Sequence, residues 1–174
     1  ALAQVLYNGK CKTCMYMKGT LILSNKWDTR FLKLAAQIGG WSKDPSTCVG
    51  AIAVNDRNVV AQGYNGFPRS INDDNERYTN REDKYKYIVH AEMNVIYNAT
   101  YNGVSLHNTT LYVHGLPVCN ECAKGVIQVG IKRVVMSKTK LPDKWKESWQ
   151  ITQNLFKEAN VKWEFIDVSD TRMD

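Results

Sequence analysis

Hydrophobic and polar positions recur at two spacings in the first third of the chain. Over residues 25–38 the apolar positions fall three or four residues apart, and Gly39 and Gly40 come directly after them, which predicts one helix. Two runs rich in β-forming residues follow at 49–54 and 59–64, separated by a short polar connection. This spacing is typical of a β-hairpin.

The second half of the chain alternates between the same two patterns. Helices are expected at 90–101, 119–129 and 146–160, and strands at 110–114, 132–136 and 161–167. Because the last three strands are linked through helices, they are expected to run parallel. The order of the elements predicts an α/β fold in which helices cover both faces of a five-stranded mixed sheet.

Two segments lack a clear period. Residues 1–24 are treated as an N-terminal extension of uncertain structure, and residues 25–174 as one domain. Residues 66–87 are polar and poor in aliphatic side chains. A connection of that length in a compact domain is usually functional or mobile, so this segment is the expected carrier of specificity.

Composition and charge agree with one globular domain. The chain has 174 residues, of which 44% are hydrophobic and 23% charged. No apolar run reaches the roughly 18 residues of a membrane span and no secretory signal is recognisable, so we expect a cytoplasmic protein with no membrane partner. The 23 basic and 17 acidic residues give a net charge of +6, which suits an anionic ligand such as a nucleotide. The basic residues are scattered, so an ordinary solvated surface is the alternative explanation.

The five cysteines are an odd number, which in a cytoplasmic chain favours free thiols or metal ligands over a disulfide framework. Cys11 and Cys14 form one C-x-x-C pair. This pair can join His107, His114 or Cys48 in a second, structural zinc site, act as a redox pair, or stay without a ligand. The sequence leaves these alternatives open.

The candidate chemistry sits in two short motifs, H-A-E at 90–92 and C-N-E-C at 119–122, each at the start of a predicted helix. Cysteines three residues apart share one helical face, and a helix N-terminus stabilises the thiolate that binds metal. His90, Cys119 and Cys122 would give zinc three protein ligands and leave a fourth position for water, as in catalytic zinc sites.

A catalytic zinc also needs a base that does not itself bind the metal. Glu92 lies two residues after His90 and fits that role, because its carboxylate can take a proton from the metal-bound water. The combination of H-x-E and P-C-x-x-C is the known signature of zinc nucleobase deaminases. This sequence departs from it at Val118, which stands between Pro117 and Cys119. The departure leaves open which backbone carbonyl receives the substrate's amine.

Longer motifs accompany the two short ones. They are K-W-D and R-F-L within 26–32, S-K-D-P-S-T-C-V-G-A at 42–51, G-Y-N-G-F-P-R at 63–69, H-A-E-M-N-V-I at 90–96 and C-N-E-C-A-K-G-V-I-Q-V-G-I-K at 119–132. On these residues the chain resembles the cytidine deaminase superfamily over roughly 26–137, and within it the deoxycytidylate (dCMP) deaminases of phage and eukaryotic type. The resemblance implies a three-layer α-β-α cytidine-deaminase-like fold and a zinc-dependent deaminase domain over 25–174.

The same resemblance implies the reaction, which is hydrolysis of dCMP to dUMP and ammonia and feeds thymidylate synthesis in pyrimidine metabolism. Members of the family need a catalytic Zn²⁺, and many are oligomers activated by dCTP and inhibited by dTTP with Mg²⁺. We therefore expect a homo-oligomer, with a hexamer favoured. Its expected location is the cytoplasm, which is the host's if the chain is phage-encoded.

Contacts with the sugar and the base are implied in the same way. Asn65 resembles the family asparagine that hydrogen-bonds the sugar hydroxyl, a role that suits an amide with both a donor and an acceptor. A left-handed turn residue beside Gly66 is the alternative interpretation. The Ala91 backbone amide is expected to hold the base carbonyl, with His90 lying flat against the ring.

Candidates for the phosphate and the remaining base contacts are Ser42, Lys43 and Thr47, together with Arg69. Lysine and arginine supply charge-assisted hydrogen bonds to phosphate. The division of these residues between a substrate site and an effector site stays open.

The segment 64–74 resembles the region where family members bind a regulatory triphosphate. Its candidate effector contacts are Tyr64, Gly66, Arg69, Asp73 and Asp74. The two aspartates would help to hold Mg²⁺ through its waters. A solvated acidic loop explains them equally well.

Three other functions compete with this interpretation. A polynucleotide deaminase that acts on cytosine or adenine in RNA or single-stranded DNA shares the zinc motif. The chain lacks the run of arginine and aromatic residues that stacks along a strand, which argues against a nucleic-acid partner. A catalytically silent zinc module would not need Glu92, and a deaminase of free nucleosides differs only in its substrate.

Overall fold

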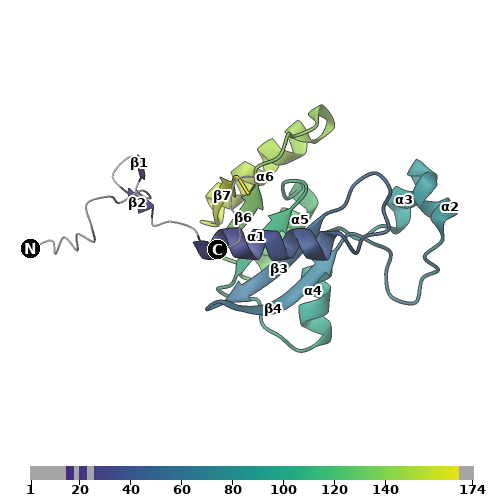
Figure 1. The fold of residues 1–174 in the computed structure, drawn as a ribbon, viewed down its shortest axis with the longest axis horizontal. Coiled ribbons are helices and arrows are strands. Elements are labelled where there is room, and N and C mark those ends of the chain that lie inside the picture. The colour runs from purple at the N-terminus through teal and green to yellow at the C-terminus, as the bar shows by residue number, and fades with distance from the viewer. Residues whose placement is uncertain (1–14, 18–19, 23–25, 169–174) are drawn as a thin grey trace, which may run out of the picture.

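The computed structural model describes residues 15–17, 20–22 and 26–168 (Figure 1). Its centre is a five-stranded mixed sheet with the spatial order β4-β3-β5-β6-β7. The strands are β3 (Gly50–Asn55), β4 (Asn58–Tyr64), β5 (Thr110–His114), β6 (Arg133–Ser137) and β7 (Lys162–Ile166). β3 pairs antiparallel with β4 and with β5, whereas β5, β6 and β7 run parallel, as their helical connections predict.

Helices cover both faces of this sheet. They are α1 (Lys26–Gly39) on one face, and α4 (Ala91–Tyr101), α5 (Asn120–Gln128) and α6 (Lys146–Glu158) on the other (Figure 1). Successive side chains of β3 point to opposite faces, so Ile52 packs with Leu32 of α1 while Ala51 packs with Val95 of α4 in a separate cluster. The expected three-layer α-β-α fold is confirmed.

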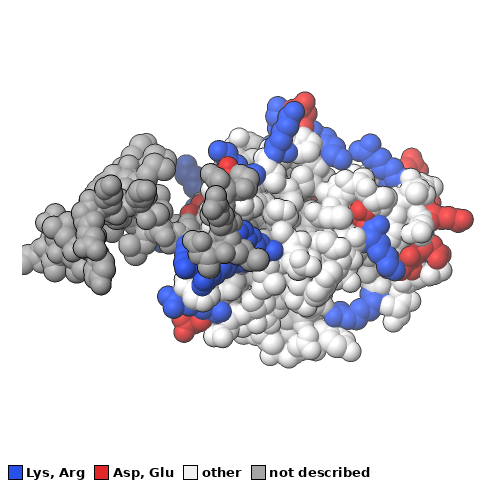
Figure 2. Space-filling view, in the orientation of Figure 1, with Lys and Arg blue, Asp and Glu red and all other residues white. Residues whose placement is uncertain are grey.

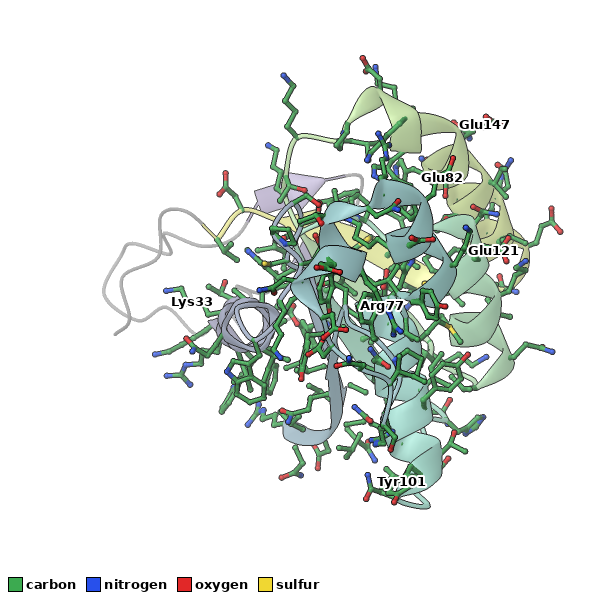
Figure 3. All side chains as sticks on the ribbon, turned by 90° about the vertical axis from the view of Figure 1, so that its right-hand side faces the viewer. Lys33, Arg77, Glu82, Tyr101, Glu121 and Glu147 are labelled. Atoms are coloured by element: carbon green, nitrogen blue, oxygen red, sulfur yellow. The ribbon has the colours of Figure 1, made fainter. Side chains whose placement is uncertain are left out.

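The main departure from the sequence prediction lies in residues 66–87. Instead of an irregular connection, this segment contains α2 (Asn75–Thr79) and α3 (Arg81–Tyr87). Asn80 caps α3, because its side-chain oxygen accepts two backbone amides of the first turn. Helices this short carry no readable apolar period, so periodicity could not predict them. They lie across one end of the molecule, with α1 on one side and α5 and α6 on the other (Figure 3).

In the N-terminal part, β1 (Met15–Met17) and β2 (Thr20–Ile22) form a small antiparallel pair. The division into an extension over 1–24 and a deaminase domain over 25–174 stays a prediction. Cys11 and Cys14 lie outside the described residues, so the alternatives for this pair remain as the sequence left them.

The charged side chains do not form one basic surface on the face seen in Figure 2. Lysines and arginines lie there in several separate groups, and acidic side chains gather at the end that α2 and α3 occupy (Figure 2). That face therefore offers no continuous basic band of the kind that follows a nucleic-acid strand. Among the described residues, no helix is both long enough and apolar enough to cross a membrane.

Candidate metal centre and active-site pocket

Three metal-binding side chains meet where two helices begin. His90 directly precedes α4, Cys119 directly precedes α5, and Cys122 lies in the first turn of α5. The His90 Nδ1 atom lies 3.4 Å from each of the two Sγ atoms. All three ligand atoms lie within 4.8 Å of one another. The structure thus brings together the side chains that the sequence predicts as ligands.

Their spacing fits a zinc ion. Zn–S bonds of about 2.3 Å and Zn–N bonds of about 2.0 Å at a tetrahedral angle place the sulfur and nitrogen atoms about 3.5 Å apart. Within the part of the chain that the structure describes, no other group of three His, Cys, Asp or Glu side chains is close enough to hold a metal. In particular, Cys48, His107 and His114 do not come together there, and Cys48 is an exposed free thiol.

Close packing behind the centre fixes the first turns of both helices. A Cβ on Gly63 of β4 would lie 2.6 Å from the Ala91 carbonyl oxygen and 2.6 Å from the Val95 nitrogen, so only a glycine lets α4 pack directly on this strand. At α5, the Ser148 hydroxyl of α6 accepts the Asn120 amide at 3.0 Å. Backbone packing thus positions the ligands, independently of any metal.

Glu92 lies beside the ligand atoms and is only 4% exposed. One of its carboxylate oxygens accepts a hydrogen bond from the Cys122 thiol at 3.7 Å. Burial raises the pKa of Glu92 to about 7, and negative charge on Cys119 adds to the rise. A carboxyl group with such a pKa can both take up and release a proton near neutral pH.

A pocket opens onto this centre and draws its lining from four parts of the chain. The lining residues are Asp44, Thr47 and Val49 after α1, Asn65 after β4, Lys84, Tyr85, Ile88, His90, Ala91 and Glu92 from α3 to α4, and Leu116, Pro117, Cys119, Lys144 and Trp145 around α5 and η1 (Asp143–Trp145). The Trp145 ring stands edge-on to His90, with the ring centroids 6.4 Å apart. The pocket therefore joins the metal centre to charged side chains on α3 and η1.

Asn65 is buried at the side of this pocket. Its Oδ1 accepts the Val49 amide at 2.8 Å, and its Nδ2 donates to the Thr47 carbonyl at 2.8 Å and to Asp44 at 3.4 Å. Asn65 is not among the residues with a positive φ. The interpretation as a left-handed turn residue beside Gly66 is therefore wrong, because the backbone there does not adopt that conformation.

The sequence pattern of the family described as the cytidine and deoxycytidylate deaminase zinc-binding region matches residues 25–138. The chain belongs to this family. The expected resemblance to dCMP deaminases is confirmed by the relatives and by a solved structure with the same fold.

Two curated relatives show the extent of the similarity to this deaminase family. A probable deoxycytidylate deaminase of Drosophila melanogaster is 45% identical over 129 residues, which are 68% of this chain and 62% of that protein. The deoxycytidylate deaminase of Mus musculus is 40% identical over 144 residues, which are 78% of this chain and 77% of that protein. The chain thus spans less than two thirds of the length of the fly relative.

Among solved structures, the fold is similar to that of the dCMP deaminase from the cyanophage S-TIM5 in complex with dCMP and dUMP. The TM-score is 0.67 at 22% sequence identity, and the match covers 83% of this chain and 100% of the phage protein. At this identity the comparison supports the fold, which agrees with the three-layer arrangement described above.

The departure from the family's P-C-x-x-C signature has a structural explanation. The Val118 side chain is completely buried, and its carbonyl accepts a hydrogen bond from the Thr152 hydroxyl of α6 at 3.0 Å. Leu116 and Pro117 line the pocket in its place. The extra residue is thus directed into the core and is held there by α6.

Of the other predicted substrate residues, Thr47 and Ala91 line the pocket, whereas Ser42 lies behind it. The Ser42 hydroxyl donates to the Asn65 carbonyl at 2.7 Å, so it supports a lining residue. Lys43 is exposed outside the lining, and its ammonium pairs with a carboxylate at 2.7 Å.

The candidate effector residues lie in two different places. Asp73 is the partner of Lys43 and also accepts the Tyr78 hydroxyl at 2.9 Å. Arg69 instead contacts α4, where its guanidinium carbon lies 4.6 Å from the centre of the Tyr101 ring.

The remaining effector candidates surround the end of β4. Tyr64 stands edge-on to Trp41, with ring centroids 6.2 Å apart. Gly66 pairs with Val89 through an isolated antiparallel bridge, and Asp74 directly precedes α2. The bridge from Gly66 to Val89 thus holds the beginning of the segment 64–74 beside the start of α4.

Sequence reasoning missed five polar or aromatic residues of the pocket lining: Asp44, Lys84, Tyr85, Lys144 and Trp145. Asp44 stands inside the S-K-D-P-S-T motif, so that motif could have pointed to it. The other four come from α3 and η1, short elements that no periodicity marks.

Proposed function

We propose that this chain is a zinc-dependent enzyme that hydrolyses dCMP to dUMP and ammonia. The observation that carries the proposal is the His/Cys/Cys centre with the buried Glu92 carboxyl beside it, at the inner end of a pocket. The two deoxycytidylate deaminase relatives support dCMP as the substrate.

In this mechanism His90, Cys119 and Cys122 would hold the zinc ion through one nitrogen and two sulfur atoms. When bound, zinc lowers the pKa of its water and so supplies a nucleophile at neutral pH. Glu92 takes a proton from the attacking water and gives it to N3 of the cytosine ring while the water oxygen bonds to C4. It then passes the proton of the new C4 hydroxyl group to the amine, whose bond to C4 breaks, so that ammonia leaves. Its burial and raised pKa support this shuttle.

The base is held by backbone groups around the centre. The Ala91 amide belongs to the first turn of α4, where helix amides lack intrahelical partners, and it holds the base carbonyl while the His90 ring lies against the base. The amine is accepted by a carbonyl of Leu116 or Pro117. This choice is supported by the pocket lining, which includes Leu116 and Pro117, whereas Val118 is buried outside it.

Asn65 recognises the sugar through its oxygen. Both hydrogens of its Nδ2 are used by Thr47 and Asp44, and its Oδ1 already accepts one bond from Val49. An amide oxygen has two lone pairs, so one acceptor position remains for a sugar hydroxyl. Thr47 lies in the same lining.

The phosphate is received at the mouth of the pocket by Lys144 and Arg81. Lys144 lines the pocket, and the Arg81 guanidinium carbon lies 5.7 Å from the centre of the Tyr85 ring. Burial by itself raises the pKa of Tyr85. The neighbouring cations Arg81 and Lys144 nevertheless hold this pKa below its usual value. Within the described chain neither cation has an ion-pair partner, so both charges are available to an anion.

Regulation by dCTP and dTTP, with Mg²⁺ and a homo-oligomer, is proposed on the resemblance of the segment 64–74. Asp73 is paired with Lys43, so a metal ion that used this carboxylate would compete with an exposed ion pair. Such pairs contribute little to stability and are easily exchanged. The cytoplasm is the proposed location.

The test is turnover of the purified, zinc-loaded chain on four substrates side by side: dCMP, deoxycytidine, cytidine and a cytosine-containing single-stranded oligonucleotide. We expect dCMP to be preferred, with a response to added dCTP and dTTP. Preferred turnover of the oligonucleotide would instead identify a polynucleotide deaminase. Turnover of deoxycytidine equal to that of dCMP would show that the enzyme does not recognise the phosphate. No turnover of any substrate would leave a zinc module without catalysis.

A further inference from the structure

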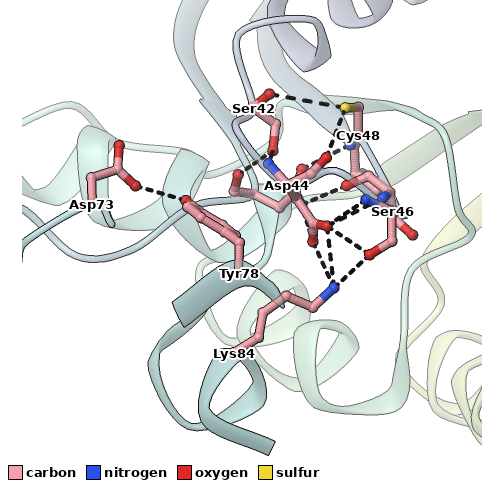
Figure 4. A network of polar contacts seen from close by, with 10 residues as sticks. Ser42, Asp44, Ser46, Cys48, Asp73, Tyr78 and Lys84 are labelled. Atoms are coloured by element: carbon pink, nitrogen blue, oxygen red, sulfur yellow. Dashed lines mark hydrogen bonds and ion pairs between the residues drawn. The ribbon is translucent and has the colours of Figure 1, made fainter. Parts of the chain in front are cut away.

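One lysine of α3 is buried, unlike the other charged side chains of that helix. The Lys84 side chain is 9% exposed, and its ammonium lies 3.1 Å from Asp44, whose side chain is 3% exposed. The same ammonium donates to the Ser46 hydroxyl at 2.7 Å. Figure 4 shows Lys84 reaching from α3 to both partners. Forty positions separate this lysine from Asp44 in the sequence.

Asp44 organises the turn on the other side of this ion pair. Its Oδ1 accepts the backbone amides of Ser46 at 2.9 Å and Thr47 at 3.3 Å (Figure 4). Its Oδ2 accepts from the Asn65 amide at 3.4 Å. Although burial by itself raises the pKa of Asp44, the hydrogen bonds from Ser46 and Lys84 hold it below its usual value. The carboxylate is therefore charged and joins the turn, the asparagine and α3.

The helix that carries Lys84 needs such a tether. α3 has seven residues, and a helix of that length is not stable by itself in water. Two residues of one pocket wall belong to this part of the chain: Tyr85 directly follows Lys84, and Ile88 directly follows the helix. The place of this wall relative to the metal centre thus depends on side-chain contacts made by α3.

A buried ion pair is not in itself a strong stabilising device. The desolvation of both charges largely offsets their attraction, whereas removal of one partner leaves an uncompensated buried charge. What such a pair does supply is a fixed geometry between the elements that carry it. Because its charge is cancelled by Asp44, Lys84 is also less suited than Lys144 to receive a phosphate.

We propose that Lys84 is a positioning residue: its ion pair with Asp44 sets the distance between Asn65 on one side of the pocket and Tyr85 on the other, and so selects ligands that reach from a sugar contact to a phosphate contact. This inference rests on the proposed function, since it takes the pocket to be the nucleotide site. Lys84 itself does not touch the reacting atoms.

The first test replaces Lys84 by Met, which keeps the length of the side chain and removes its charge. We expect the KM for dCMP to rise by about tenfold or more, as for misplaced positioning groups, while kcat stays within about threefold of the parent enzyme. The matched control is Lys86→Met on the same helix, because Lys86 forms an exposed pair with Asp83. We expect this control to behave as the parent.

A second readout does not depend on activity. In Lys84→Met, amide hydrogen exchange over 81–88 should speed up by about tenfold or more while α4 and α5 keep their protection. Unchanged exchange in a folded Lys84→Met protein would overturn the proposal, and so would a loss of kcat at constant KM. If the parent enzyme did not deaminate dCMP, the proposed function would fail, but this exchange comparison would still decide whether Lys84 anchors α3.

The charge itself is tested by Asp44→Asn, which keeps an oxygen for the Ser46 and Thr47 amides. We expect a similar rise in KM, and the double variant Asp44→Asn/Lys84→Met should be no worse than the poorer single variant, since the two changes remove one interaction. Additive effects would show that the residues act separately and would contradict the proposal. The double variant has no unpaired buried charge, so it also serves if Lys84→Met alone does not fold.

Discussion

The two sides of the pocket are built in different ways. The metal side stands on the first turns of α4 and α5, which pack on the sheet through a continuous apolar cluster that includes Val95 and Val126. The opposite wall stands on α3, which is held by the Lys84–Asp44 pair, a capping asparagine and aromatic contacts. One side is therefore fixed by apolar packing on the sheet, and the other by polar and aromatic contacts away from the sheet.

This difference assigns separate tasks to the two sides. Chemistry at the metal needs ligand atoms that stay within a few tenths of an ångström, which close packing provides. Recognition of the far end of a nucleotide needs charged groups at the solvent edge, where packing is sparse. Changes on the metal side should therefore affect metal content and kcat, and changes on the α3 side should affect KM.

The largest effect is expected from Cys122→Ser. A serine hydroxyl stays protonated near neutral pH, so one of three ligands is lost and activity should fall to background. The measurement is zinc content per chain together with dCMP turnover. Cys48→Ser is the matched control, because Cys48 is an exposed free thiol. Full zinc content and full activity in Cys122→Ser would show that the metal side is not the catalytic side.

The next effect is expected from Glu92→Gln. The amide cannot carry a proton, so kcat should fall by at least about 100-fold while zinc stays bound. Steady-state kinetics and a zinc assay of the same preparation check this. Glu121→Gln is the control, since Glu121 is an exposed glutamate beside Cys122 that pairs with Lys124. Retained turnover in the zinc-loaded Glu92 variant would show that Glu92 is not the proton carrier.

The same contrast explains how much could be predicted from the sequence. Helices α1, α4, α5 and α6 and all five strands of the main sheet were predictable, because packing on a sheet imposes a period of two or three to four residues. His90, Cys119 and Cys122 were predictable because a metal ion requires particular ligand types, and here they stand in two short motifs, H-A-E and C-N-E-C. Both signals are local in the sequence.

The α3 wall could not be predicted for the opposite reason. Its helices are held by polar contacts between distant residues, such as Lys84 and Asp44, and those contacts leave no periodic pattern. Lys43 and Arg69, the candidates for nucleotide contacts whose division between substrate and effector sites stayed open, show the same limit, since neither lines the pocket at the metal centre. A basic residue in a motif indicates charge, but its direction depends on partners such as Asp73 and Tyr101.

A smaller effect, on stability first, is expected from Gly63→Ala. The new Cβ would meet the backbone of α4 at 2.6 Å, so α4 must move away from β4. Overpacking of this kind lowers the free energy of unfolding by about 1–3 kcal/mol. Thermal unfolding of the zinc-loaded protein measures it.

Gly66→Ala is the control for stability, since a Cβ there would make only ordinary contacts, the nearest at 3.6 Å. Because Gly63 packs against the turn that carries Glu92, the kcat of the Gly63 variant should fall by a larger factor than its KM rises. A rise in KM with unchanged kcat would show that the packed side also governs substrate recognition, which contradicts this division of tasks.

The smallest effect is expected from Lys144→Met at the mouth of the pocket. Loss of one charge-assisted contact to phosphate should raise the KM for dCMP by about tenfold, since such bonds contribute about 1.5–3 kcal/mol. The KM for deoxycytidine, which has no phosphate, should not change. Lys140→Met is the control, because Lys140 lies in the same loop, is exposed and does not line the pocket. If Lys43→Met raised the KM for dCMP and Lys144→Met did not, the phosphate would bind outside the pocket mouth, and the α3 side would lose its assigned role.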